Sequence, residues 1–81
     1  MIGITTIPAS MVHATQWWLD DDWVAGLLNP APVEVCLGPD GDYYVTNGHH
    51  RLAAHLQQGT TDIPVVIGTC PPEAGFIRTW R

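Results

Sequence analysis

The sequence predicts a small α+β domain in which a β-hairpin leads directly into a helix. Residues 32–37 alternate apolar and polar side chains, and residues 43–46 are aromatic or β-branched, with a turn-forming Gly-Pro-Asp-Gly between them. Residues 49–58 then contain no glycine or proline and place apolar side chains at helical spacing. With a further apolar run at 63–67, these segments predict a small mixed sheet with the helix packed on it.

The length and composition fit one small domain with a single core. The chain has 81 residues, of which 46% are hydrophobic. We predict one domain over residues 1–81, with its core at 31–67 and a tail at 71–81. For this tail a last strand, a cover over the core and disorder are all open alternatives.

The N-terminal part predicts a strand and a short helical turn. Residues 1–7 are apolar and β-branched, and Pro8 cannot donate to a sheet, so we expect a short strand at an edge. Ser10 is a candidate cap for a helical turn through residues 11–13.

A second helix is indicated over residues 23–28. Three consecutive aspartates at 20–22 precede it, where negative charge interacts favourably with the helix dipole, and Asn29-Pro30 ends it. We interpret the aspartates as a helix cap, because a divalent-metal site would need ligands from elsewhere in the fold.

The turn between the hairpin and the main helix predicts an anion site. Gly48 can adopt a positive φ and Asn47 can cap a helix, so the first-turn N–H groups are exposed. Those groups and the helix dipole attract an anion, with His49, His50 and Arg51 placed on the same turn. A phosphate is the natural ligand.

These segments also resemble the core of the ParB/sulfiredoxin superfamily. The resemblance covers roughly residues 31–67, a little under half of the chain. It rests on Gly-His-His-Arg-Leu-Ala-Ala at 48–54, on Gly59, on Ile-Pro-Val-Val-Ile at 63–67, and on the upstream strand and hairpin turn.

The resemblance implies a nucleotide-binding domain. In that superfamily the matching Gly-to-Arg segment holds nucleotide phosphates: CTP in ParB, ATP in sulfiredoxin and a nucleotide in ParB-like kinases of free serine. Other members are nucleases. We therefore expect an ATP- or CTP-type nucleotide or a phosphorylated small molecule, with or without Mg²⁺, at Asn47, Gly48, His49, His50 and Arg51. A phosphotransfer or nuclease reaction would have His49 and His50 as catalytic candidates.

The motif departs from the better-known members at three positions. ParB has Gly-Glu-Arg-Arg where this chain has His49 and His50, which leaves Arg51 as the permanent positive charge. Sulfiredoxin has its catalytic cysteine where His49 stands, so sulfinic-acid reduction is not expected. Asn47 occupies a place where related sequences have aspartate.

The histidine spacing argues against a metal site on the helix. His49 and His50 precede His55 by six and five residues, so they diverge around the axis, and a distant residue such as His13 would be needed. We expect His49 to face the sheet, His50 and Arg51 to lie on the open side, and His55 to be an ordinary surface residue.

Charge and aromatic content bear on the partners. The net charge is −5, from eight acids and three arginines, which opposes stand-alone DNA binding. Trp17 and Trp18 are adjacent, so we expect one of them to be exposed. The alternative function is therefore a non-enzymatic regulatory module that binds a protein partner through an acidic, tryptophan-rich surface.

The remaining features suggest a cytoplasmic protein. Cys36 lies in a predicted strand and Cys70 beyond the last one, so we expect free thiols. The N-terminus lacks a signal-peptide pattern, and no stretch of some 18 apolar residues would span a membrane.

Overall fold

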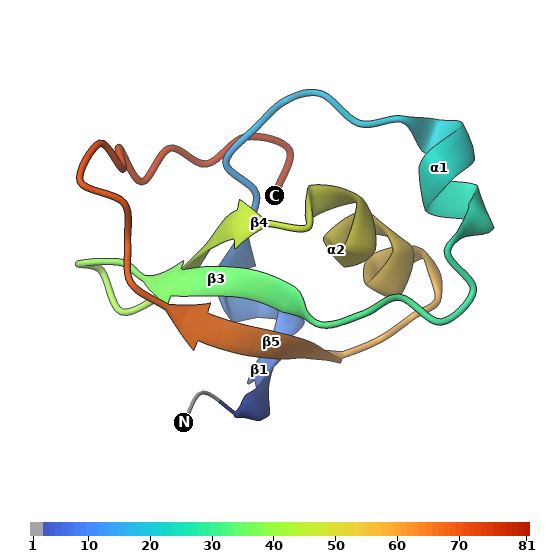
Figure 1. The fold of residues 1–81 in the computed structure, drawn as a ribbon, viewed down its shortest axis with the longest axis horizontal. Helices are drawn as coiled ribbons and strands as arrows, with labels where there is room; N and C mark the ends of the chain where they lie inside the picture. Colours follow the sequence, from blue (N-terminus) through green and yellow to red (C-terminus); the bar gives the residue numbers. More distant parts are fainter. Residues whose placement is uncertain (1–2) are drawn as a thin grey trace.

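The computed structural model describes residues 3–81 and forms a five-stranded mixed sheet with two helices (Figure 1). The strand order is β1-β5-β3-β4-β2, with β1–β5 and β3–β4 antiparallel and β3–β5 and β2–β4 parallel. The elements are β1 (Ile4–Pro8), β2 (Val12–His13), α1 (Asp21–Gly26), β3 (Val33–Leu37), β4 (Tyr43–Asn47), α2 (His49–Gln57) and β5 (Asp62–Gly68). The predicted α+β fold class is confirmed.

The β3–β4 hairpin and the following helix form as the sequence pattern predicts. Val35 faces Val45 across the hairpin and Cys36 faces Tyr44. Alternation places Val35 and Val45 in the core, where both are almost fully buried. The hairpin and β5 share one sheet because β3 pairs with both.

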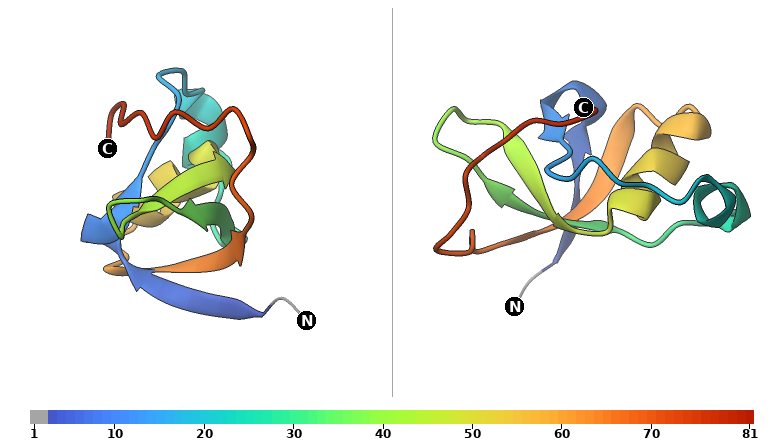
Figure 2. Two further views of the ribbon diagram at one scale, coloured as in Figure 1. Left: turned by 90° about the vertical axis from the view of Figure 1, so that its left-hand side faces the viewer. Right: turned by 90° about the horizontal axis from the view of Figure 1, so that it is seen from above.

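The helix α2 lies between the sheet and α1 (Figure 2). Leu52 is fully buried in the main core with the inward residues of β3, β4 and β5. Ala53 and Ala54 meet Val24 of α1 in a second, smaller cluster. Small residues on the outer face of α2 thus allow α1 to approach closely.

The first strand is at an edge of the sheet, as predicted. Met1 and Ile2, which belonged to the predicted strand, lie outside the described residues. The prediction of a helical turn over residues 11–13 is wrong. A 3₁₀ turn spans Ala9–Met11 instead, and Ser10 does not cap it. Val12 and His13 instead pair with β4, which is a long-range contact that the local sequence does not reveal.

A continuous apolar run such as residues 63–67 is typical of a strand covered on both faces, but β5 is covered on one face only. Ile63 and Val65 on one face are fully buried, whereas Pro64 and Val66 on the other face are only half-buried. Only one face of this strand meets the core beneath α2. The helix α1 ends at Gly26, two residues earlier than expected.

The C-terminal segment (residues 70–81) lies over the domain without forming a helix or strand (Figure 1). Trp80 packs against both core clusters, and Ala14 exchanges backbone hydrogen bonds with Thr79 and Arg81. Of the three alternatives for residues 71–81, a last strand, a cover over the core and disorder, the structure shows the cover over the core.

The expectation of free thiols is wrong, because Cys36 and Cys70 form a disulfide. Their Cα atoms are 5.1 Å apart, within the usual range for bridged cysteines. The bond was not predictable from spacing, since it depends on the tail returning to β3. Within residues 3–81, neither helix approaches the length and apolar character that crossing a membrane requires.

Candidate functional site

The N-terminus of α2 is an open backbone cradle. Gly48 precedes the helix with φ +95° and ψ 34°, and its carbonyl accepts the first helical hydrogen bond from Leu52. No side chain caps this end of the helix. The N–H groups of His49, His50 and Arg51 have no intrahelical acceptors, because the first turn of a helix leaves them without partners.

These residues line a pocket of about 460 Å³ between α2 and the segment that contains α1. The α2 side contributes the five predicted binding residues, Asn47 to Arg51. The opposite wall consists of Gln16, Trp18, Trp23 and Leu27. Of these, the sequence had pointed only to Trp18, as part of a partner-binding surface and not of this pocket. A positive helix end therefore opens into a pocket with an aromatic wall.

His49 is buried and held in a neutral state. Its Nε2 accepts a hydrogen bond from the Thr15 N–H at 3.0 Å. Burial, together with the nearby His50, lowers the pKa of His49 to about 4. Because Nε2 accepts, the proton of the neutral ring lies on Nδ1. His49 thus faces the body of the domain, as predicted.

His50 is not on the open side as expected; it is 9% exposed. Its ring stacks on Trp23, with centroids 4.3 Å apart, and lies nearly perpendicular to the Trp18 ring, with centroids 5.1 Å apart. Its Nε2 accepts the N–H of Asp20 at 3.0 Å. The segment leading into α1 covers this side of α2, and a helical period cannot anticipate that contact.

Arg51 brings the permanent positive charge to the pocket, as expected. Its guanidinium donates through Nη1 to the carbonyl of Pro32 at 3.2 Å, which ties it to the loop before β3. Asn47 is the last residue of β4 and is exposed. The structure thus brings all five predicted binding residues to one pocket.

The other histidines lie outside this pocket. His55 was expected at the surface, yet it is buried, with its Nε2 3.2 Å from the carbonyl oxygen of Ala31. The loop before β3 covers it. His13 pairs with Asp42 at 2.6 Å between their nearest side-chain atoms, at the hairpin. Among residues 3–81, no three His, Cys, Asp or Glu side chains gather to hold a metal ion.

The acidic triplet acts as a helix cap, as we interpreted it. The side chain of Asp20 accepts the Trp23 N–H at 3.2 Å, and Asp21 and Asp22 occupy the first turn of α1. Of the adjacent tryptophans, both are exposed and not just one, Trp17 at 74% and Trp18 at 63%.

Neither a family model nor a curated protein matches the sequence. Solved structures, by contrast, match this chain in fold. ParB from Caulobacter crescentus with CTP-gamma-S superimposes with a TM-score of 0.68 at 17% identity, over 86% of this chain and 46% of ParB. Sulfiredoxin from Arabidopsis thaliana gives 0.68 at 24% identity, over 84% and 86% of the two chains. A free serine kinase in complex with AMP gives 0.68 at 18% identity, over 80% and 30%.

These similarities show the fold. The chain has a ParB/sulfiredoxin-like fold, as the motif resemblance predicted. It spans about half or less of the ParB and kinase structures and most of the sulfiredoxin structure.

Proposed function

We propose that this chain is a ParB-like domain that binds a nucleotide or another phosphorylated small molecule at the N-terminus of α2. The observation that carries the proposal is the uncapped first turn of α2, which opens into a pocket lined by Asn47, Gly48, His49, His50 and Arg51. Two structures of the same fold have CTP-gamma-S and AMP bound.

In this proposal the phosphate is held mainly by the backbone. The free N–H groups of the first turn and a helix dipole of roughly half a charge favour an anion at this point. Gly48 has no Cβ that would crowd the approach, and a Cβ there would lie 3.3 Å from Cδ of Arg51. Arg51 adds the full positive charge.

The aromatic wall favours a nucleotide over bare phosphate. Trp18 lines the pocket and leaves 63% of its surface exposed, which offers a face on which a base can stack. A triphosphate brings more negative charge than Arg51 alone can balance. Binding of ATP or CTP would therefore gain from Mg²⁺, whereas a monophosphate needs no metal.

The histidines fit a binding role better than a role as a general base. The Nε2 lone pairs of His49 and His50 are both engaged by backbone N–H groups. Proton abstraction from a hydroxyl or water would have to break one of these bonds. We therefore propose binding as the function, with phosphotransfer or phosphodiester cleavage requiring a base from elsewhere.

The alternative function, a regulatory module that binds a protein partner, has one observation in its favour. Trp17 is 74% exposed and does not line the pocket. Such a module would show no nucleotide binding. In either case we propose a cytoplasmic location, although the Cys36–Cys70 disulfide removes the free thiols that had suggested it.

Calorimetry with AMP, ATP and CTP, each with and without Mg²⁺, tests the proposed function. Replacing Arg51→Ala removes a charge-assisted contact worth about 1.5–3 kcal/mol, so the affinity should fall by about tenfold or more. The control Asp62→Asn changes the net charge at an exposed residue that does not line the pocket, and should bind like the wild type. Unchanged binding in Arg51→Ala would contradict the assignment.

A further inference from the structure

The C-terminal segment is anchored at its two ends and makes few hydrogen bonds in its middle. At its start the disulfide joins Cys70 to Cys36 in β3. At its end Arg78 pairs with Asp40 at 2.7 Å, and Thr79 and Arg81 bond to the backbone of Ala14. Between these anchors, the one backbone hydrogen bond of the described residues is internal, from Ala74 to Pro71.

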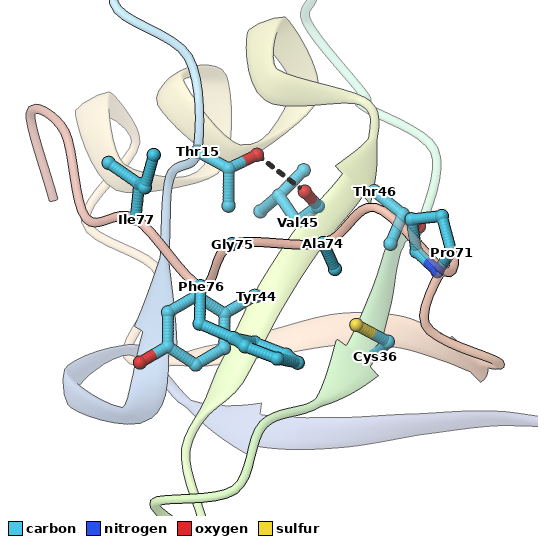
Figure 3. Close-up of a pocket in the computed structure, with 10 residues that line it drawn as sticks. All are labelled: Thr15, Cys36, Tyr44, Val45, Thr46, Pro71, Ala74, Gly75, Phe76 and Ile77. Carbon is cyan, nitrogen blue, oxygen red and sulfur yellow. Dashed lines mark hydrogen bonds between the residues drawn. The ribbon is translucent and has the colours of Figure 1, made fainter.

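A second pocket, of about 230 Å³, lies between the middle of this segment and β4 (Figure 3). Figure 3 shows the Phe76 ring against Tyr44, with Cys36 and Thr15 also at the pocket. Phe76 has φ +51°, an unfavourable backbone conformation for a residue other than glycine. The middle of the segment thus meets β4 through the Phe76 ring, whose centroid lies 5.2 Å from that of Tyr44. The last pair between β3 and β5 joins Cys36 to Gly68, and the disulfide is the further tie that holds the start of the segment on β3.

The same segment supports a wall of the α2 pocket. Thr79 donates its N–H to the Ala14 carbonyl at 3.0 Å and its hydroxyl to the Gln16 carbonyl at 2.6 Å. Residues 14–16 in turn reach the pocket, because the Thr15 N–H binds Nε2 of His49 and Gln16 lines the cavity. A continuous path thus runs from the disulfide through residues 71–81 and 14–16 to His49.

We propose that the Cys36–Cys70 disulfide is a redox-sensitive latch that controls the order of residues 14–16, and through them the α2 pocket. The coupling to ligand affinity rests on the proposed function. In a reducing compartment the bond would be subject to cellular dithiols, and disulfides that form there are usually transient, catalytic or redox-sensing.

A dithiol can open the latch in two balanced steps. Its thiolate attacks Sγ of Cys70, which is half-buried, whereas Cys36 is 1% exposed. The Sγ–Sγ bond breaks, Cys36 leaves as a thiolate and takes up a proton, and a mixed disulfide forms at Cys70. The second thiol of the dithiol then displaces Cys70, so that two electrons and two protons pass to the protein and the dithiol becomes a cyclic disulfide.

Amide hydrogen exchange with and without dithiothreitol tests the latch without any ligand. Reduction should expose the amides of Ala14, Thr15 and Thr79, while those of Val35 and Val65 in the sheet stay protected. Cys70→Ser should show the open pattern in both conditions, and the neighbouring exposed control Thr69→Ser should respond like the wild type. Protection that persists at residues 14, 15 and 79 after reduction would overturn the proposal. Loss of protection throughout the sheet would overturn it too, since the bond would then hold the whole fold.

Calorimetry with AMP on the oxidised and reduced protein tests the coupling to the pocket. A disordered wall should weaken AMP binding by about fivefold or more in the reduced protein. Equal affinity in both states would refute the coupling. If AMP binds neither form, the proposed function fails, and the exchange measurement still decides whether the latch exists.

Discussion

Gly48 sets both the path of the chain and the access of an anion to α2. Its φ of +95° is a conformation that costs a residue with a Cβ about 1–2 kcal/mol. Gly59, just beyond the other end of α2, has φ +78° and open space where a Cβ would stand. A Cβ would introduce the same kind of backbone strain at either glycine, but only Gly48 lines the pocket.

Gly48→Ala should therefore lose stability and ligand affinity, whereas Gly59→Ala should lose stability alone. We expect each to lower the free energy of unfolding by about 1–2 kcal/mol in denaturant titrations. Calorimetry with AMP should detect weaker binding for Gly48→Ala only. Equal affinities of the two variants would show that the cradle at Gly48 does not receive the ligand.

His49 should make the domain less stable in mild acid. Its pKa is about 4 in the folded protein, below the ordinary 6.5, so the unfolded chain binds the proton more readily. The stability associated with neutral His49 is complete above pH 6.5 and is lost as the pH falls towards 4. After allowance for partial solvent screening, this amounts to about 1–3 kcal/mol.

Urea unfolding between pH 7 and pH 4 measures this loss, and His49→Gln should show a shallower pH dependence than the wild type. The neighbouring His50 contributes to the shift and stays in both proteins. Asp40 affects the free energy of unfolding in a separate, more acidic pH range. A hydrogen bond from Tyr44, with help from Arg78, lowers the pKa of Asp40 to about 2. Its contribution is lost only below its ordinary pKa of 3.8. Identical slopes for both proteins would contradict the buried, neutral state of His49.

At the residue level, the sequence predicted the backbone conformation at Gly48 and the exposed first-turn N–H groups. It did not predict the surroundings of His50 and His55. The positive φ of Gly48 follows from local turn chemistry, and the structure shows it. The burial of His50 and His55 depends on Asp20 and Ala31, which are distant in sequence. A helical period assigns faces correctly only for the side that packs on the sheet.

Among the elements, α1 is a short helix with a side-chain N-cap, Asp20. It has six residues, too few to be stable by helix propensity, so its cap and its packing on α2 must hold it. The side chain of Asp20 accepts the Trp23 N–H, while the Asp20 backbone N–H reaches His50. Trp23 of this element, together with Trp18 before it, forms the aromatic wall of the pocket.

Asp20→Ala should lower the free energy of unfolding by about 0.5–2 kcal/mol, the usual effect of removing an N-cap. Asp21→Ala, a matched control on an exposed first-turn residue, loses only a dipole interaction of roughly 0.3–1 kcal/mol. Thermal or denaturant unfolding of the two variants gives the comparison. A larger loss for Asp21→Ala would mean that the cap does not hold α1.

Elements defined by local pattern were predictable, and those defined by long-range pairing were not. The hairpin and α2 follow from alternation, turn residues and helical spacing. By contrast, β2 has only two residues and exists through its pairing with Tyr43 and Tyr44. The cover formed by residues 70–81 likewise depends on Ala14 and Cys36, at large sequence separation.

For the whole molecule, charge and architecture together narrow the proposed ligand. A chain with net charge −5 repels polyanions. The positive end of α2 and Arg51 form a small region that attracts anions within this negative surface. The opposite wall comes from residues 16–27, which the fold brings over α2. A small ligand with a phosphate and an aromatic base matches this pocket better than a nucleic acid does.

The most direct test of this account is an NMR titration of the amide groups with AMP, with inorganic phosphate in parallel. Binding at the α2 cradle predicts chemical-shift changes concentrated at Gly48, His49, His50 and Arg51. The indole N–H of Trp18 should shift with AMP and not with phosphate. An absence of changes at residues 48–51, or changes confined to the second pocket around Tyr44 and Phe76, would contradict the proposed site.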